Sequence, residues 1–144
     1  MGIRKITLIV DNFQFSKAPM KEIIEQRLTI NKQGRIWFSE YISGLKYAKK
    51  TQIRYEQFSI SDDVSEEIFS LFESVFTPLF KSVVVKDGRD WDLTITDDDD
   101  VETHFVGAIG YELKAQNKNL SEYLRDVIQI DNLFLFDGEG IVLE

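Results

Sequence analysis

The amino-acid sequence predicts an α+β fold, in which a mainly antiparallel sheet of about six strands carries two helices on one face. Hydrophobic and polar residues alternate in the first 60 residues and again after residue 90, as in half-buried strands. Between and after these two blocks, hydrophobic residues recur every three to four positions, as on one side of a helix. The element order is therefore ββββ-α-ββ-α. Hairpin-length spacing between strands favours antiparallel neighbours.

The first block predicts four strands, at residues 4–10, 23–30, 35–41 and 52–60. Residues 11–22 and 43–50 are expected to be connections between them. Gly34 can adopt the left-handed conformation that closes a short hairpin after Asn31. The third strand is aromatic, and we expect its aromatic side chains to belong to the core: Trp37, Phe38 and Tyr41.

The fourth strand contains a change of pattern. Ile53 and Tyr55 share one side of an extended chain, whereas Phe58 and Ile60 fall on the other. This change predicts a bulge or bend near Gln57.

The first helix is predicted from apolar residues at helical spacing, and it should form the centre of the core: Val64, Ile68, Leu71, Phe72, Val75, Phe76 and Leu79. Asp63 and Glu66 have the spacing of a capping box at its start, and Pro78 should kink or end it. Two further strands follow, around Trp91–Thr96 and Phe105–Ile109. Asn119 and Glu122 form a capping box at the start of the second helix.

Composition bounds the class of protein. The chain has 144 residues, 43% of them hydrophobic, and we expect a single domain spanning residues 1–144. The absence of cysteine excludes disulfides, a cysteine nucleophile and thiolate metal sites. No apolar run approaches the length of a membrane span, and no signal-peptide pattern opens the sequence. These observations predict a soluble, cytoplasmic protein.

The most conspicuous segment is a run of four aspartates, Asp97, Asp98, Asp99 and Asp100, extended by Glu102. Its simplest interpretation is a solvated hairpin turn that favours solubility. Calcium binding is a second interpretation, but the run lacks the glycine and the distant glutamate of an EF-hand. A third is a negative surface that docks on a basic partner. A second acidic patch is expected at the first helix, formed by Asp62, Asp63, Glu66 and Glu67.

Charge is distributed unevenly along the chain. The net charge is −8, but residues 1–54 carry +7 and residues 55–144 carry −15. The densest basic segment is Lys46, Lys49, Lys50 and Arg54, with tyrosines interleaved. Basic residues beside aromatic ones suit single-stranded nucleic acid, but the overall acidity makes direct nucleic-acid binding a weaker prediction than an exposed charged edge. Attraction between the basic and acidic parts of two subunits would give a salt-sensitive homo-oligomer.

Motifs for catalysis are scarce. His104 is the only histidine, and it cannot form the usual zinc site without further nitrogen or sulfur ligands. No nucleophile elbow and no glycine-rich phosphate loop occurs in the sequence. We therefore predict no cofactor, no metal and no catalytic residue.

The sequence favours a non-enzymatic protein-binding domain that covers a basic surface of its partner through the acidic residues. An inhibitor or immunity-type protein is the specific form of this hypothesis. Two alternatives stay open. One is a small ligand-binding domain or enzyme with a site between sheet and helices. The other is a structural subunit that assembles through its oppositely charged parts.

Overall fold

The computed structural model describes residues 2–11, 23–43, 50–81 and 90–137. The predicted connections at 11–22 and 43–50 lie almost wholly outside these ranges, as do Lys46 and Lys49. Within these ranges, ten elements follow one another: β1 (Ile3–Asp11), β2 (Ile23–Asn31), β3 (Arg35–Ser43), β4 (Lys50–Ser59), α1 (Asp62–Val75), β5 (Asp90–Asp97), β6 (Glu102–Ala108), β7 (Lys114–Ala115), β8 (Lys118–Asn119) and α2 (Leu120–Val127).

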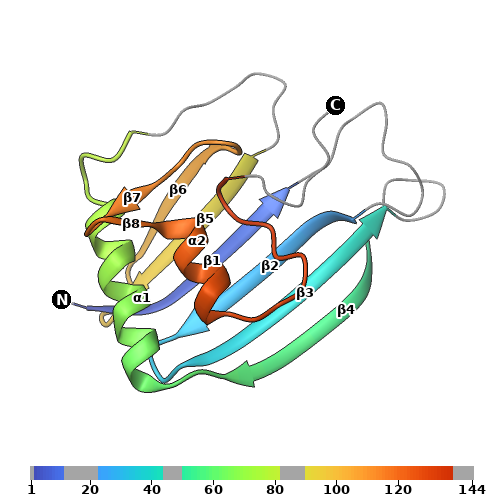
Figure 1. Cartoon of the computed structure of the whole chain (residues 1–144), viewed down its shortest axis with the longest axis horizontal. Helices are drawn as coiled ribbons and strands as arrows, with labels where there is room; N and C mark the ends of the chain where they lie inside the picture. Colours follow the sequence, from blue (N-terminus) through green and yellow to red (C-terminus); the bar gives the residue numbers. More distant parts are fainter. Residues whose placement is uncertain (1, 12–22, 44–49, 82–89, 138–144) are drawn as a thin grey trace.

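Six of the strands form one antiparallel sheet in the order β4-β3-β2-β1-β5-β6 (Figure 1). β1 lies inside the sheet, where it pairs with β2 on one side and with β5 on the other. The predicted fold class is confirmed. β7 and β8 add a two-residue hairpin just before α2, which the sequence pattern did not predict.

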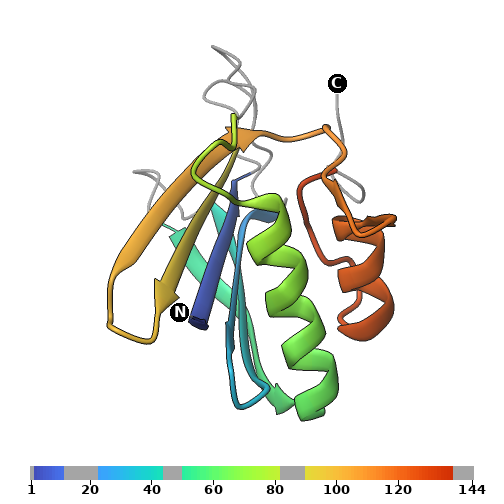
Figure 2. The ribbon, with the colours of Figure 1, turned by 90° about the vertical axis from the view of Figure 1, so that its left-hand side faces the viewer.

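Both helices lie on the same side of the large sheet, as Figure 2 shows. Strand residues alternate accordingly: Ile6, Leu8 and Val10 of β1 face the helices and are buried, whereas the residues between them are only half-buried. Because a strand exposes successive side chains on opposite faces, one face of the sheet forms the core, and no helix of the described residues covers the other, which we call the helix-free face.

An aromatic cluster joins the helical layer to the sheet. Phe76, directly after α1, lies with its ring centroid 5.8 Å from that of Trp91 in β5. Phe136 packs edge-on against Trp91 at 4.9 Å and contacts Phe72 of α1 at 6.3 Å. Such tilted and edge-on ring pairs stabilise a core beyond the area that they bury.

The segment after α2 is bound to the sheet by polar contacts. The side chain of Gln26 in β2 accepts a hydrogen bond from Phe134 N at 2.7 Å and donates one to Asn132 O at 2.8 Å. Its amide also donates to the buried carboxylate of Glu40 at 2.8 Å. These contacts hold residues 133–136 over the sheet, where all four side chains are buried.

Three local predictions need correction. The N-cap of α1 is Ser61, whose hydroxyl accepts from Val64 N, and not Asp63. The helix ends at Val75, before Pro78, so Leu79 lies outside it and its side chain is 87% exposed. The register of β4 shifts at Ile53 instead of Gln57. Tyr55 and Phe58 simply occupy opposite faces of a regular strand.

Three further predictions concern the Gly34 turn, the start of α2 and the aromatic side chains of β3. Gly34 has a φ of +84°, as the predicted hairpin requires, and the N-cap of α2 is Asn119 as predicted. Of the three aromatic residues in β3, only Phe38 belongs to the core. Trp37 and Tyr41 are half-buried on the helix-free face, because strand neighbours point to opposite sides.

The corrected helix start can be tested by removing each candidate cap. Ser61→Ala should lower the free energy of unfolding by about 1 kcal/mol, since Val64 N loses its partner. Asp63→Ala should cost less, because its carboxylate caps no backbone N–H among the described residues and is stabilised by the helix dipole. Urea denaturation measures both values. A larger loss for Asp63→Ala than for Ser61→Ala would contradict the assignment.

Candidate functional site

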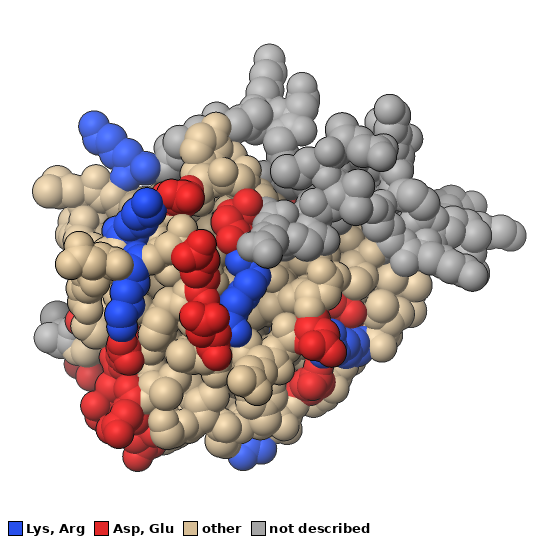
Figure 3. Space-filling view, in the orientation of Figure 1, with Lys and Arg blue, Asp and Glu red and all other residues tan. Residues whose placement is uncertain are grey.

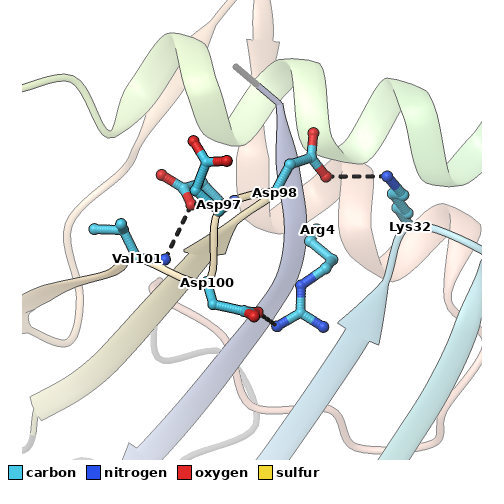
Figure 4. A network of polar contacts seen from close by, with 7 residues as sticks. Arg4, Lys32, Asp97, Asp98, Asp100 and Val101 are labelled. Atoms are coloured by element: carbon cyan, nitrogen blue, oxygen red, sulfur yellow. Dashed lines mark hydrogen bonds and ion pairs between the residues drawn. The ribbon is translucent and has the colours of Figure 1, made fainter.

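The four aspartates form the turn between β5 and β6, and Asp97 shapes that turn. Its carboxylate accepts a hydrogen bond from Asp99 N at 2.8 Å. It accepts a second from Val101 N at 3.0 Å (Figure 4). Asp100 adopts a φ of +62°, which aspartate tolerates better than most residues. Asp97 is therefore a structural residue, and its carboxylate is directed into the turn.

Two of the remaining aspartates form ion pairs within the chain. Asp98 lies 3.0 Å from Lys32 Nζ at the β2–β3 turn, and Asp100 pairs with Arg4 of β1. The hydrogen bond from Lys32 holds the pKa of Asp98 below its ordinary value of 3.8. These pairs neutralise half of the aspartate run, so its surface is less negative than the sequence predicted.

Asp99 and Glu102 present their carboxylates to solvent. Asp99 makes no ion pair within the described part of the chain, and Glu102 lies 3.9 Å from His104 Nε2. The His104 ring also lies 3.0 Å from Thr94 Oγ1, and its side chain is 62% exposed. His104 is a surface residue with one carboxylate neighbour.

The second predicted acidic patch lies over the start of α1, where Figure 3 shows acidic side chains gathered at the lower left. Asp62, Asp63 and Glu66 are exposed. Glu67 instead pairs with Lys118 of β8, and the hydrogen bond from Lys118 lowers the pKa of the Glu67 carboxyl. Tyr123 of α2 adjoins this pair. The pKa of the Tyr123 hydroxyl is raised to about 12, mainly because the group is buried.

A shallow groove connects the two acidic segments. It has a volume of about 530 Å³ and is lined by residues of β1, the β2–β3 turn, α1 and the β5–β6 turn. Four of the lining residues are acidic: Asp62, Glu66, Glu73 and Asp98. Ile3 and Phe69, both more than nine-tenths buried, contribute apolar surface to it. We call this feature the acidic groove.

The acidic groove was only partly predictable. Asp62, Glu66 and Glu73 are spaced by four and seven residues, which places them on one side of a helix, and that signal is visible in the sequence. Asp98 joins them only because β1 pairs with both β2 and β5. This pairing brings the β2–β3 and β5–β6 turns to the same end of the sheet.

The described members of the predicted basic segment are engaged within the chain. Lys50 pairs with the buried carboxylate of Glu25 in β2. Arg54 pairs with Glu56 and donates a hydrogen bond to Asp131 O at 3.1 Å. Lys50 is thus held by β2, and Arg54 by its own strand and the segment after α2.

No group of three or more His, Asp or Glu side chains among the described residues is arranged to hold a metal ion. Neither helix in that part of the chain is long and apolar enough to cross a membrane. No model of a known protein family matches the chain, and no curated protein has a similar sequence.

The Lys32–Asp98 pair gives a prediction about pH. The Asp98 carboxylate is stabilised in the folded state, so its contribution is present above its ordinary pKa of 3.8 and is lost as the pH falls through the lowered value. Lys32→Gln should raise the pKa of Asp98 in a carboxyl NMR titration. Lys114→Gln, whose partner is Glu112, should leave it unchanged. An unchanged Asp98 titration in Lys32→Gln would show that the pair does not persist in solution.

Proposed function

We propose that this chain is a non-enzymatic protein-binding domain that docks the acidic groove onto a basic surface of its partner. The observation that carries the proposal is the convergence of α1 and the β5–β6 turn on one groove rimmed by carboxylates. The specific form that we favour is an inhibitor or immunity-type protein, which covers a functional basic surface of another protein.

The state of the carboxylates supports this proposal. Asp62, Glu66 and Glu73 are exposed, and no cation among the described residues pairs with them. Their charge is therefore available to an incoming partner, whereas that of Asp98 is already balanced by Lys32. Unpaired charges around a recessed surface accelerate the encounter with a basic partner and select against acidic ones.

The apolar lining gives the groove a second means of recognition. Ile3 and Phe69 lie beside the carboxylates, so a lysine or arginine could lay its aliphatic stem along them and place its cationic end on the rim. A basic loop or helix of a folded protein has this combination of features. A metal ion would instead need oxygen ligands that converge on one point.

An internal ligand site has weaker support. Large buried side chains such as Phe72, Leu93 and Phe136 occupy the space between sheet and helices. Among the described residues, His104 and Glu102 line neither the acidic groove nor two other surface hollows, of about 530 and 320 Å³. These observations favour recognition at the surface over the enzyme and ligand-binding alternatives.

Neutralising the rim should slow binding. The triple variant Asp62→Asn, Glu66→Gln, Glu73→Gln should lower the association rate for a captured partner by about tenfold or more at low salt. The partner is first isolated from lysate of the source cells with the wild-type chain. Purified partner is then measured by surface plasmon resonance at about 0.05 M and 0.5 M salt, where screening removes most of the difference.

A matched control separates a local effect from total charge. The variant Glu112→Gln, Glu122→Gln, Asp126→Asn also removes three exposed carboxylates, one of them in the first turn of α2, and should bind as wild type does. Asp97 is kept in every variant because it shapes the turn. Equal loss in both triple variants, or an association rate independent of salt, would refute the acidic groove as the interface.

A further inference from the structure

The helix-free face of the sheet has an unusual composition for a surface in contact with water. One cross-strand row on this face contains Tyr55 of β4, Ser39 of β3, Arg27 of β2, Ile9 of β1, Asp92 of β5 and Val106 of β6. Tyr55 and Val106, at the two ends of the row, are 54% and 49% exposed. The solvated face of an antiparallel sheet is ordinarily polar, so these two apolar ends require an explanation.

The side of this face formed by β2, β3 and β4 combines aromatic rings with guanidinium groups. Arg27 lies 4.9 Å above the ring of Tyr41, and Arg35 lies 5.9 Å from that of Trp37. Between them the face has a hollow of about 320 Å³, which Trp37, Tyr41 and Tyr55 help to line. Tryptophan, tyrosine and arginine are the residues enriched at the centres of protein interfaces.

The opposite side of the same face is negative. Asp90 and Asp92 of β5 lie two residues apart, and no cation of the described chain pairs with either. Burial and the nearby charge of Asp92 raise the pKa of Asp90. The face therefore has cations on β2 and β3, anions on β5 and an exposed apolar side chain near each lateral edge.

Nucleic acid fits this face poorly. A phosphate backbone needs cations along its whole track, but this face carries Asp90 and Asp92 on β5, across β1 from Arg27. Arg27 is already paired with Glu25, which leaves it less available to a phosphate. A partner with both signs of charge fits better.

We propose that the occupant of the helix-free face is a second copy of this chain. The two sheets face each other and are related by a twofold axis that runs parallel to the strands, above the boundary between β1 and β2. This axis reverses the lateral order of the strands in the second copy. β3 and β4 of one copy then lie over β5 and β6 of the other, as in a β-sandwich. Tyr55 meets Val106 of the second copy, and Arg27 of each copy lies in the same row as Asp92 of the other.

This inference concerns a surface separate from the acidic groove and does not rest on the proposed function. It also revises the expected self-assembly. Some basic and acidic side chains pair within one molecule, as Arg4 with Asp100, Lys32 with Asp98 and Arg27 with Glu25. On the helix-free face, Asp90 and Asp92 pair with no cation of the described chain, so their charge is available to the arginine side of a second copy.

The absence of native cysteine allows a direct test by disulfide trapping. Tyr55→Cys and Val106→Cys are prepared as two single variants, mixed, and oxidised. The expected product is a disulfide-linked dimer containing one chain of each variant, detected by mass spectrometry. Within one chain the two positions are five strand spacings apart, about 24 Å, so they cannot form a disulfide with each other. Leu79→Cys, at an 87% exposed position, is the control for random collision and should yield little dimer with either variant.

Sedimentation velocity provides an independent measurement. The wild-type chain should form dimers that dissociate on dilution and at higher salt, and Val106→Arg should shift it to monomer. Leu79→Arg should sediment as wild type. The acidic-groove triple variant should also sediment as wild type, because its changes lie outside the helix-free face, and this result would separate dimer formation from the proposed function. Circular dichroism verifies that each variant is folded.

Four results would overturn the proposal. The first is a wild-type chain that stays monomeric up to millimolar concentration. The second is a Tyr55→Cys self-disulfide that forms as efficiently as the mixed one, because it requires a different axis. The third is quenching of tryptophan fluorescence when the monomer binds a thymidine oligonucleotide, with the effect lost in Trp37→Ala. The fourth is the binding of a different protein to this face. Such a protein would protect the cysteines of Tyr55→Cys and Val106→Cys from chemical modification.

Discussion

The packing of aromatic rings between the helices and the sheet is the interaction on which the other features of this protein depend. Phe72 and Phe76 extend from α1 and its end, Phe136 from the segment after α2, and Trp91 from the sheet. Gly107 in β6 is part of this arrangement, since a β-carbon there would lie 2.5 Å from the Trp91 ring. Because this packing holds both helices on one face, it exposes the other face and positions α1 beside the β5–β6 turn.

Electrostatic interactions follow from that arrangement. The sheet order places β1 beside β5, which lets Arg4 and Lys32 of the basic first part of the chain reach Asp100 and Asp98 of the acidic remainder. The exposed pairs contribute little to stability, but they decide which carboxylates stay available. The free charge therefore lies on α1, at Asp62, Glu66 and Glu73, more than on the aspartate run.

The two proposed surfaces differ in their chemistry as well as in their place. The acidic groove is lined by four carboxylates and one cation, Lys32, around a small apolar strip, and this excess of negative charge suits a transient partner of opposite charge. The helix-free face has both signs and several aromatic residues, which suits association with a surface of the same composition. Because the groove and the face lie on different parts of the fold, a dimer could carry two acidic grooves.

The sequence by itself determined the element order, the antiparallel fold class, the hairpin at Gly34 and the start of α2 at Asn119, because each depends on neighbouring residues and on periodicity. It misplaced the cap of α1 and the irregularity in β4, because Ser61 lies just outside the apolar pattern and a strand with apolar residues on both faces resembles one with a bulge. Only the tertiary structure decided that Asp97 shapes its turn, that Lys32 and Arg4 neutralise its neighbours, and that Asp98 shares a groove with α1. These facts depend on which distant strands become neighbours, and long-range pairing leaves no periodic signal in a single sequence.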